Sequence, residues 1–266
     1  MTRLKTRPAV DIQVEARGQV PRGAAGYARE KTLAALDHLS EPVLAARVKL
    51  TQAANAASGR PAAAQAVVDV NGCPVRAHVA AGTMFEAVDL LRDRLVARLA
   101  RTRRHNRGDH HGDTVRLPGD RWHDDGHEHR PQHRQLPAEE RQIVRHKSFG
   151  LPRQTPEEAV FDLESMDYDF YLFADADSGR DSVVYRDPRT GYHRMATADK
   201  ATAEPPAAPH LTVSEVPAPE ISVREATERL ALTGLPFVFF LDSASGRGHV
   251  LYHRYDGHYG LITPAA

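Results

Sequence analysis

The carboxyl-terminal half of this 266-residue chain contains an internal repeat, and this repeat limits what the chain can fold into more than any other feature. With an offset of 67 residues and no gap, residues 143–195 align with residues 210–262, and 13 of the 53 aligned pairs are identical. Each copy is expected to form a short strand, a short helix (155–166 and 222–233) and two strands joined at Ser-Gly-Arg. A unit of about 55 residues is marginal alone and exposes strand edges, so we expect the two copies to pair with each other.

The first 107 residues predict a separate domain. Residues 9–17 and 43–51 alternate between apolar and polar side chains, which is typical of half-buried strands. Between them, residues 20–39 carry apolar residues at helical spacing. Two further strands are expected on either side of Asn71 and Gly72, because both residues tolerate the positive φ of a hairpin turn.

A long helix is predicted to complete this domain. Thr83 and Glu86 have the spacing of a capping box, and the helix is expected to run to about Arg104. Its predicted buried face is Phe85, Val88, Leu91, Leu95 and Leu99. The order β-α-β-β-β-α predicts an α+β fold, a sheet with both helices packed on one face.

After residue 107 the composition of the chain changes. Residues 108–140 are rich in His, Gly, Asp, Pro and Arg without periodicity, and are expected to form a flexible linker. The first repeat is assigned to residues 141–198, an Ala/Pro linker to 199–209 and the second repeat to 210–266. The spacing of His123 and His127 would suit a metal on a helix, but the neighbouring Gly and Pro favour a solvated linker.

Charge separates the two halves of the chain, although the formal net charge is zero. Residues 1–107 carry 18 Lys and Arg against 9 Asp and Glu, a net of +9, whereas residues 151–266 carry 10 against 18, a net of −8. Such asymmetry indicates that the basic half meets a polyanion. Arg94, Arg98 and Arg101 are predicted to form one arginine stripe opposite the apolar face, suited to phosphate oxygens.

Two sets of candidate binding residues follow. The RNA-binding set consists of Arg22, Tyr27, Arg29, Lys31, Arg92, Arg94, Arg98, Arg101, Arg103 and Arg104. The repeats are acidic and would repel a phosphate backbone, so their aromatic residues are interpreted as packing rather than as base-stacking groups. The predicted repeat–repeat interface consists of Phe170, Phe173, Tyr185, Phe237, Phe240, Tyr252 and Tyr259.

Several functional classes lose support. The chain has one cysteine, Cys73, which excludes an intramolecular disulfide and a thiolate zinc cage. It has no Gly-x-Ser-x-Gly, phosphate-loop or dinucleotide-binding motif, so we expect no catalytic residue, metal or cofactor. It also has no apolar run of membrane-spanning length and no secretory signal, which predicts a cytoplasmic protein without a membrane partner.

Specific motifs in the repeats resemble the carboxyl-terminal domain of long ribosome hibernation-promoting factors. They are Ile143-Val-Arg-His-Lys-Ser-Phe149, Thr155-Pro-Glu-Glu-Ala159 and Tyr252-His-Arg-Tyr-Asp-Gly-His-Tyr-Gly-Leu-Ile262. Residues 9–104 are similar to the family's amino-terminal domain through Tyr27-x-x-x-Lys31, Phe85-Glu-Ala-Val-Asp89 and Arg94-Leu95. The duplicated carboxyl-terminal domain resembles the dormancy- and hypoxia-induced factors of actinobacteria.

This resemblance implies a non-enzymatic protein of the stress response that inhibits translation. It implies that the basic domain binds 16S-type rRNA of the small ribosomal subunit, in the mRNA and tRNA channel, with Lys31, Arg94 and Arg101 at matching positions. Ribosomal proteins are further candidate partners. In the family, the usual single repeat forms homodimers that join two ribosomes.

The duplication favours pairing within the chain and the silencing of single ribosomes, because the tether raises the effective concentration of one copy at the other. The alternatives are a homodimer that bridges two ribosomes, a modulator of a transcription factor, and a metal-dependent enzyme built on the histidine tract.

Overall fold

The computed structural model describes residues 10–37, 39–53, 59–106, 134, 136–187, 192–198, 211–214 and 216–265. The chain divides into two compact units. The first comprises Met1–Gln132 together with Ser165–Asp167, and the second comprises His133–Glu164 and Tyr168–Ala266. Most of the predicted histidine linker lies outside the described residues, including His123 and His127. The whole Ala/Pro linker, residues 199–209, also lies outside them.

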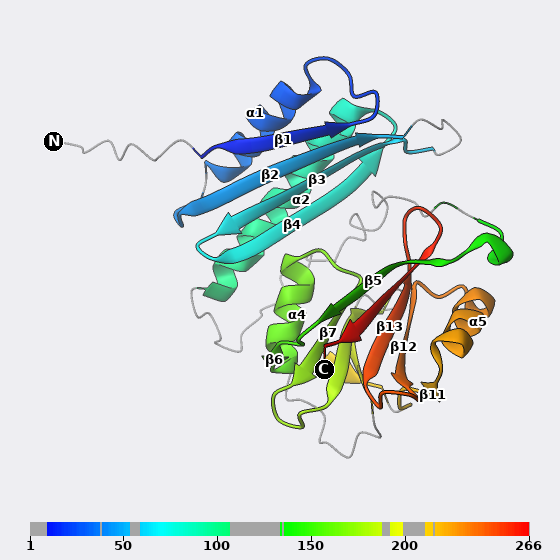
Figure 1. Ribbon diagram of the computed structural model, residues 1–266. Coiled ribbons are helices and arrows are strands. Elements are labelled where there is room, and N and C mark those ends of the chain that lie inside the picture. The colour runs from blue at the N-terminus through cyan, green and yellow to red at the C-terminus, as the bar shows by residue number, and fades with distance from the viewer. Residues whose placement is uncertain are drawn as a thin grey trace. The chain divides into compact units, whose positions relative to one another are not determined.

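The first unit is one four-stranded sheet with two helices (Figure 1). The elements are β1 (Ile12–Arg17), α1 (Ala24–Leu36), β2 (Val43–Gln52), β3 (Ala62–Val70), β4 (Cys73–Ala81) and α2 (Met84–Asn106). Strand β1 pairs parallel with β2, and β2, β3 and β4 pair antiparallel in sequence order.

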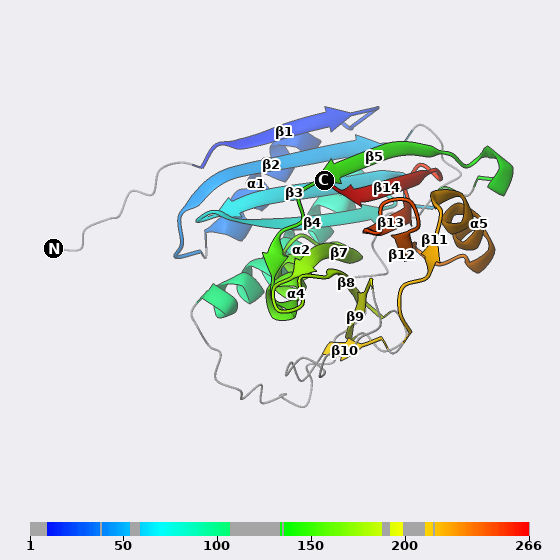
Figure 2. The ribbon, with the colours of Figure 1, turned by 60° about the horizontal axis from the view of Figure 1, so that its bottom comes forward.

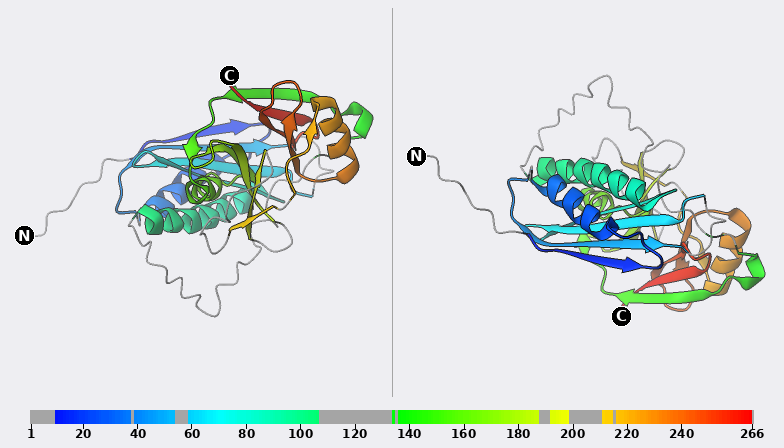
Figure 3. Two further views of the ribbon diagram at one scale, coloured as in Figure 1. Left: turned by 90° about the horizontal axis from the view of Figure 1, so that it is seen from below. Right: turned by 90° about the horizontal axis from the view of Figure 1, so that it is seen from above.

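Both helices cover the same face of this sheet, as Figure 3 shows. Alternate residues of the strands supply the sheet side of the core, and β3 alternates strictly between buried and half-buried positions. Small residues such as Ala24 and Ala28 let α1 approach closely, while Leu91, Leu95 and Leu99 fill the interior from α2. Phe85 was expected on the buried face but is 42% exposed, and its place is taken by Met84 and Ala87.

The predicted turn and cap of the first unit have the expected geometry. Asn71 and Gly72 have φ of 53° and 88°, which fits a tight hairpin between β3 and β4. The Glu86 backbone N–H donates to Thr83 Oγ1 at 3.3 Å, and the Thr83 N–H donates to Glu86 Oε2 at 3.4 Å. This reciprocal pair satisfies two N–H groups at the start of α2.

Apart from Ser165–Asp167, the second unit contains the two repeats, and the elements of the repeats follow the 67-residue offset. A short 3₁₀ helix, η1 (Ala138–Glu140), precedes them. The first copy supplies β5 (Ile143–Phe149), β6 (Arg153–Gln154), α4 (Pro156–Ser165), β7 (Phe170–Asp175), β8 (Asp181–Arg186) and β9 (His193–Thr197). The second supplies β10 (Leu211–Val213), β11 (Glu220–Ile221), α5 (Val223–Thr233), β12 (Phe237–Asp242), β13 (Gly248–His253) and β14 (Tyr259–Pro264).

The two repeats exchange their first strands. One sheet has the order β10-β9-β8-β7-β6 and the other has the order β11-β12-β13-β14-β5. Strand β10 of the second copy therefore pairs parallel with β9 of the first, and β5 of the first copy pairs parallel with β14 of the second (Figure 2). The side chain of Leu211 on β10 is buried in the core of the first repeat. Each sheet is thus complete only when both copies take part.

The second unit has three hydrophobic clusters that correspond to its layers. One lies between α4 and its sheet and a second lies between α5 and its sheet. The third joins the opposite faces of the two sheets and includes Leu172, Val183, Phe239 and Val250. The helices therefore cover the outer faces, and the inner faces pack on each other.

The α+β class, with a β-α-β-β-β-α domain and two small α+β repeats, is confirmed. In the described residues each repeat supplies five strands instead of the expected three, β5 to β9 in the first copy and β10 to β14 in the second. None of the helices in the described part of the chain is long and apolar enough to cross a membrane.

Candidate nucleic-acid interface and repeat contact

Helices α1 and α2 of the first unit bring Tyr27 and Lys31 to Asp89. The Tyr27 hydroxyl donates to Asp89 Oδ1 at 2.8 Å, and Lys31 Nζ lies 3.1 Å from the same oxygen. Lys31 Nζ also lies 5.0 Å from the centre of the Tyr27 ring, which packs edge-on against Phe85. Hydrogen bonding with Tyr27 and Asp89 raises the pKa of Lys31, so its positive charge is secured. Lys31 is therefore held in place and partly neutralised.

The other predicted arginines differ in exposure. Arg22, Arg29 and Arg101 are exposed. Arg92 forms an ion pair with its neighbour Asp93, and Arg103 lies 3.8 Å from Glu41. Arg104 lies in α2, but its side chain is outside the described set. Arg22, Arg29 and Arg101 are therefore the members of the set whose side chains lie at the surface of the first unit.

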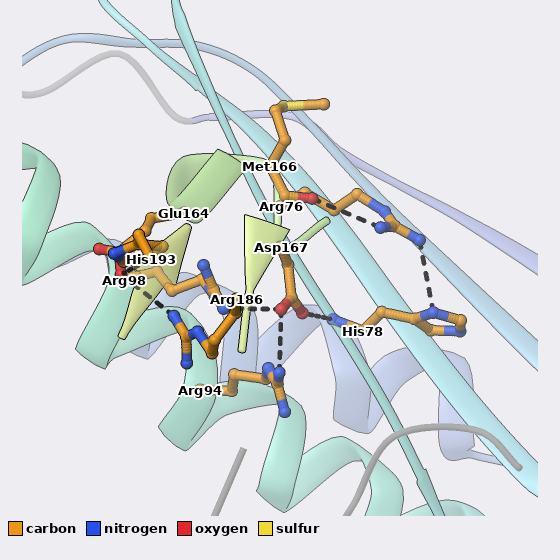
Figure 4. Close-up of polar contacts among 9 residues, drawn as sticks. All are labelled: Arg76, His78, Arg94, Arg98, Glu164, Met166, Asp167, Arg186 and His193. Carbon is orange, nitrogen blue, oxygen red and sulfur yellow. Dashed lines mark hydrogen bonds and ion pairs between the residues drawn. The ribbon is translucent and has the colours of Figure 1, made fainter. Parts of the chain in front are cut away.

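Arg94 and Arg98 of the expected arginine stripe lie against an acidic side chain. Both belong to the first unit together with Asp167, whose carboxylate lies 2.9 Å from Arg94 and 2.6 Å from Arg98 (Figure 4). The backbone N–H of His78 donates to the same carboxylate at 3.2 Å. Arg98 is only 6% exposed, and a buried arginine needs such an anionic partner. The stripe is thus not a continuous solvent-facing surface.

Basic side chains that the sequence pattern did not single out lie on the sheet face opposite the helices. Arg47, Lys49 and Arg76 lie there, at alternate positions to the core residues of β2 and β4. Arg47 donates to Gln13 at 3.3 Å, and Arg76 donates to Gln65 at 3.3 Å. The alternation that predicted the strands already places these residues away from the core.

An aromatic cluster joins the two repeats in the second unit. The ring centres of Phe170 and Phe237 are 4.8 Å apart. Phe170 also lies 5.6 Å from Tyr252, and Phe237 lies 5.4 Å from Tyr185. Since 170 corresponds to 237 and 185 to 252 at the 67-residue offset, the two longer contacts are equivalent. The cluster therefore has approximate two-fold symmetry.

Three other aromatics predicted for this interface lie outside the aromatic cluster. Phe173 and Phe240 are fully buried beneath α4 and α5, each within its own repeat. The Tyr259 ring lies in the core beneath α5 as well, although its backbone N–H donates to the Gln142 carbonyl of the first copy. Alternation along a strand explains this, because residues 170 and 173 point to opposite faces.

The described residues do not assemble a metal centre: no three of their His, Cys, Asp and Glu side chains are grouped to hold an ion. Cys73 carries a free, half-buried thiol.

Comparison with known proteins identifies both repeats. The family described as "Sigma 54 modulation/S30EA ribosomal protein C terminus" matches twice, at residues 138–193 and 211–261. Over 226 residues the chain is 37% identical to the "Dormancy associated translation inhibitor" of Mycobacterium tuberculosis. The aligned segment covers 82% of this chain and 76% of the relative. The chain belongs to the ribosome hibernation promotion factor family.

Other members of the hibernation factor family match a smaller part of the chain. The "Ribosome hibernation promotion factor" of Picosynechococcus is 28% identical over 170 residues, 62% of this chain and 86% of the relative. The protein of the same name from Deinococcus radiodurans is 30% identical over 181 residues, 64% of this chain and 88% of the relative.

Proposed function

We propose that this hibernation factor inhibits translation by binding rRNA in the mRNA and tRNA channel of the small ribosomal subunit. We further propose that it stabilises idle single ribosomes rather than joining ribosomes in pairs. The observation that carries the proposal is the similarity to a protein named as a dormancy associated translation inhibitor, which extends over most of both chains.

The first unit supplies the chemistry for contact with RNA. Its exposed arginines, Arg22 just before α1, Arg29 on α1 and Arg101 on α2, present planar guanidinium groups that can each bind two phosphate oxygens. Arg47 and Lys49 add positive charge on the sheet face opposite the helices. A domain with basic groups on two faces suits a channel with RNA walls better than a flat surface.

The second unit supports the single-ribosome part of the proposal. The first strands are exchanged within one chain, and the Phe170–Phe237 contact is also made within one chain. The surfaces through which single repeats of two chains could associate are therefore already occupied. A tethered partner also outcompetes a free one at ordinary protein concentrations.

Co-sedimentation with purified small subunits tests the rRNA contact. We expect binding that weakens steeply as salt is raised, together with inhibition of a cell-free translation reaction. The variant Arg29→Glu/Arg101→Glu should lose both, whereas a matched exchange on α5, Arg224→Glu/Arg229→Glu, should keep both. Equal loss in the two variants, or no binding by the unchanged protein, would refute the proposed contact.

A further inference from the structure

Asp181 and Gly248 lie together at the contact between the repeats. They occupy equivalent positions in the two copies, since they are 67 residues apart. The Gly248 backbone N–H donates to Asp181 Oδ2 at 2.8 Å. Residues that are equivalent in two copies and also touch each other lie on the approximate two-fold axis, as Phe170 and Phe237 do. At Asp181 and Gly248, however, the symmetry is broken, because one is a carboxylate and the other has no side chain.

Arg247 completes this asymmetric contact. Its Nε donates to Asp181 Oδ2 at 2.8 Å and its Nη2 donates to Asp181 Oδ1 at 3.1 Å, which is a two-point arginine–carboxylate pair. The Asp181 side chain is only 7% exposed, so its charge depends on these three donors. All three donors come from the second repeat.

Only glycine fits at position 248, because the first repeat leaves no room there for a side chain. A Cβ atom at this position would lie 2.7 Å from Asp181 Cβ and 2.9 Å from the Phe239 ring. The first of these distances is too short for two carbon atoms, so any side chain at 248 would push the sheets apart. The close approach of the repeats therefore works only with glycine on one side.

The same geometry disfavours pairs of like repeats. Two first repeats would bring Asp181 against another Asp181, with overlapping Cβ atoms and adjacent buried carboxylates. Two second repeats would bring Gly248 against Gly248, with two Arg247 side chains and no carboxylate to bind them. Only a first repeat against a second repeat combines the carboxylate, the arginine and the space.

We propose that Asp181, Arg247 and Gly248 determine partner choice, so that the first repeat pairs with a second repeat and like repeats do not pair. This inference goes beyond the proposed function, because it concerns how the repeats recognise each other in the absence of ribosomes. The tether of residues 199–209 then makes the second repeat of the same chain the preferred partner. Two effects therefore oppose the association of two chains: the preference of a first repeat for a second repeat, and the tether that supplies this second repeat from the same chain.

Sedimentation velocity of the full-length protein over a range of concentrations tests the proposal, with urea unfolding as a second readout. The unchanged protein should be a monomer. Asp181→Gly removes the carboxylate and the steric barrier between like repeats, and should raise self-association by about tenfold or more. Gly248→Asp should lower the urea midpoint without promoting like-repeat pairs.

The decisive variant exchanges the two residues, Asp181→Gly/Gly248→Asp. Arg180 holds the position equivalent to Arg247, so the carboxylate at 248 should be bound from the other side. The monomer should be restored together with part of the lost stability, because a Cβ at 248 still lies 2.9 Å from the Phe239 ring. A control, Asp256→Asn, removes an arginine–carboxylate pair inside one repeat and should leave the protein monomeric. The proposal is overturned if Asp181→Gly and Gly248→Asp behave like the unchanged protein, or if the exchange fails to improve on the single variants.

Discussion

Phe170 and Phe237, separated by 67 residues in the sequence, lie with their ring centres 4.8 Å apart. Each is the counterpart of the other in the internal repeat, so this contact marks the axis about which the two copies pair. The second unit of this hibernation factor thus builds, within one chain, the kind of two-fold arrangement that usually requires two chains.

Replacing either phenylalanine should weaken the second unit. Phe170→Ala and Phe237→Ala each remove a partly buried ring and its aromatic contacts, and should lower the free energy of unfolding by about 3 kcal/mol. Urea unfolding followed by circular dichroism measures the effect. Leu232→Ala is the control, because Leu232 is 88% exposed on α5 and its loss should have almost no effect. Equal effects of the three substitutions would show that the rings do not join the repeats.

Strand exchange has its own test at Leu211. This side chain comes from the second copy and is buried in the core of the first, so Leu211→Ala should cost about 2 kcal/mol of unfolding free energy. Val216, five residues further along, is 74% exposed, and Val216→Ala should be silent. A silent Leu211→Ala would contradict the exchange of first strands.

RNA affinity should depend on the exposed arginines of the first unit. Arg101→Ala removes one exposed guanidinium, and we expect affinity for small subunits to fall by about fivefold and the slope of log affinity against log salt to decrease by roughly one. Filter binding at several salt concentrations measures both quantities. Arg224→Ala on α5 should change neither, and an unchanged slope for Arg101→Ala would place this arginine outside the interface.

Acid should destabilise the second unit through His249. Burial lowers the pKa of His249 below its ordinary value of about 6.5, although the carboxylates of Asp242 and Asp181 act in the opposite direction. The unfolded chain therefore binds the proton of His249 more tightly than the folded chain does. Neutral His249 makes its full contribution to the free energy of unfolding above about pH 6.5, and this contribution is lost as the pH falls toward the folded-state pKa.

Unfolding curves between pH 7.5 and pH 5, values bracketing that ordinary pKa of about 6.5, measure this dependence. His249→Gln removes the titrating group and should flatten the curve in this range. If the free energy of unfolding of the variant falls equally steeply with pH, other groups cause the acid sensitivity.

Much of the architecture follows from the sequence. The repeat offset, the alternating strands of the first domain, the Asn71-Gly72 turn and the Thr83–Glu86 cap depend on local spacing, and the structure has them where they are expected. The exchange of first strands could not be predicted, because β5 and β10 have the same local pattern whichever sheet they join.

Local pattern also fails to distinguish the two faces of a buried strand. Phe170 and Phe173 both belong to an apolar run, but only the packing of two sheets on one side and a helix on the other separates their roles. Arg98 illustrates a further limit, since charge at helical spacing indicates a solvated face unless a distant carboxylate such as Asp167 is brought to it.

Density-gradient sedimentation of purified 70S ribosomes with increasing amounts of the full-length protein tests the central claim most directly. We expect the protein to travel with small subunits and single ribosomes, to protect single ribosomes from dissociation, and to produce no ribosome-dimer peak at any protein concentration. A ribosome-dimer peak that grows with added protein would contradict the conclusion that the two repeats use their pairing surfaces within one chain.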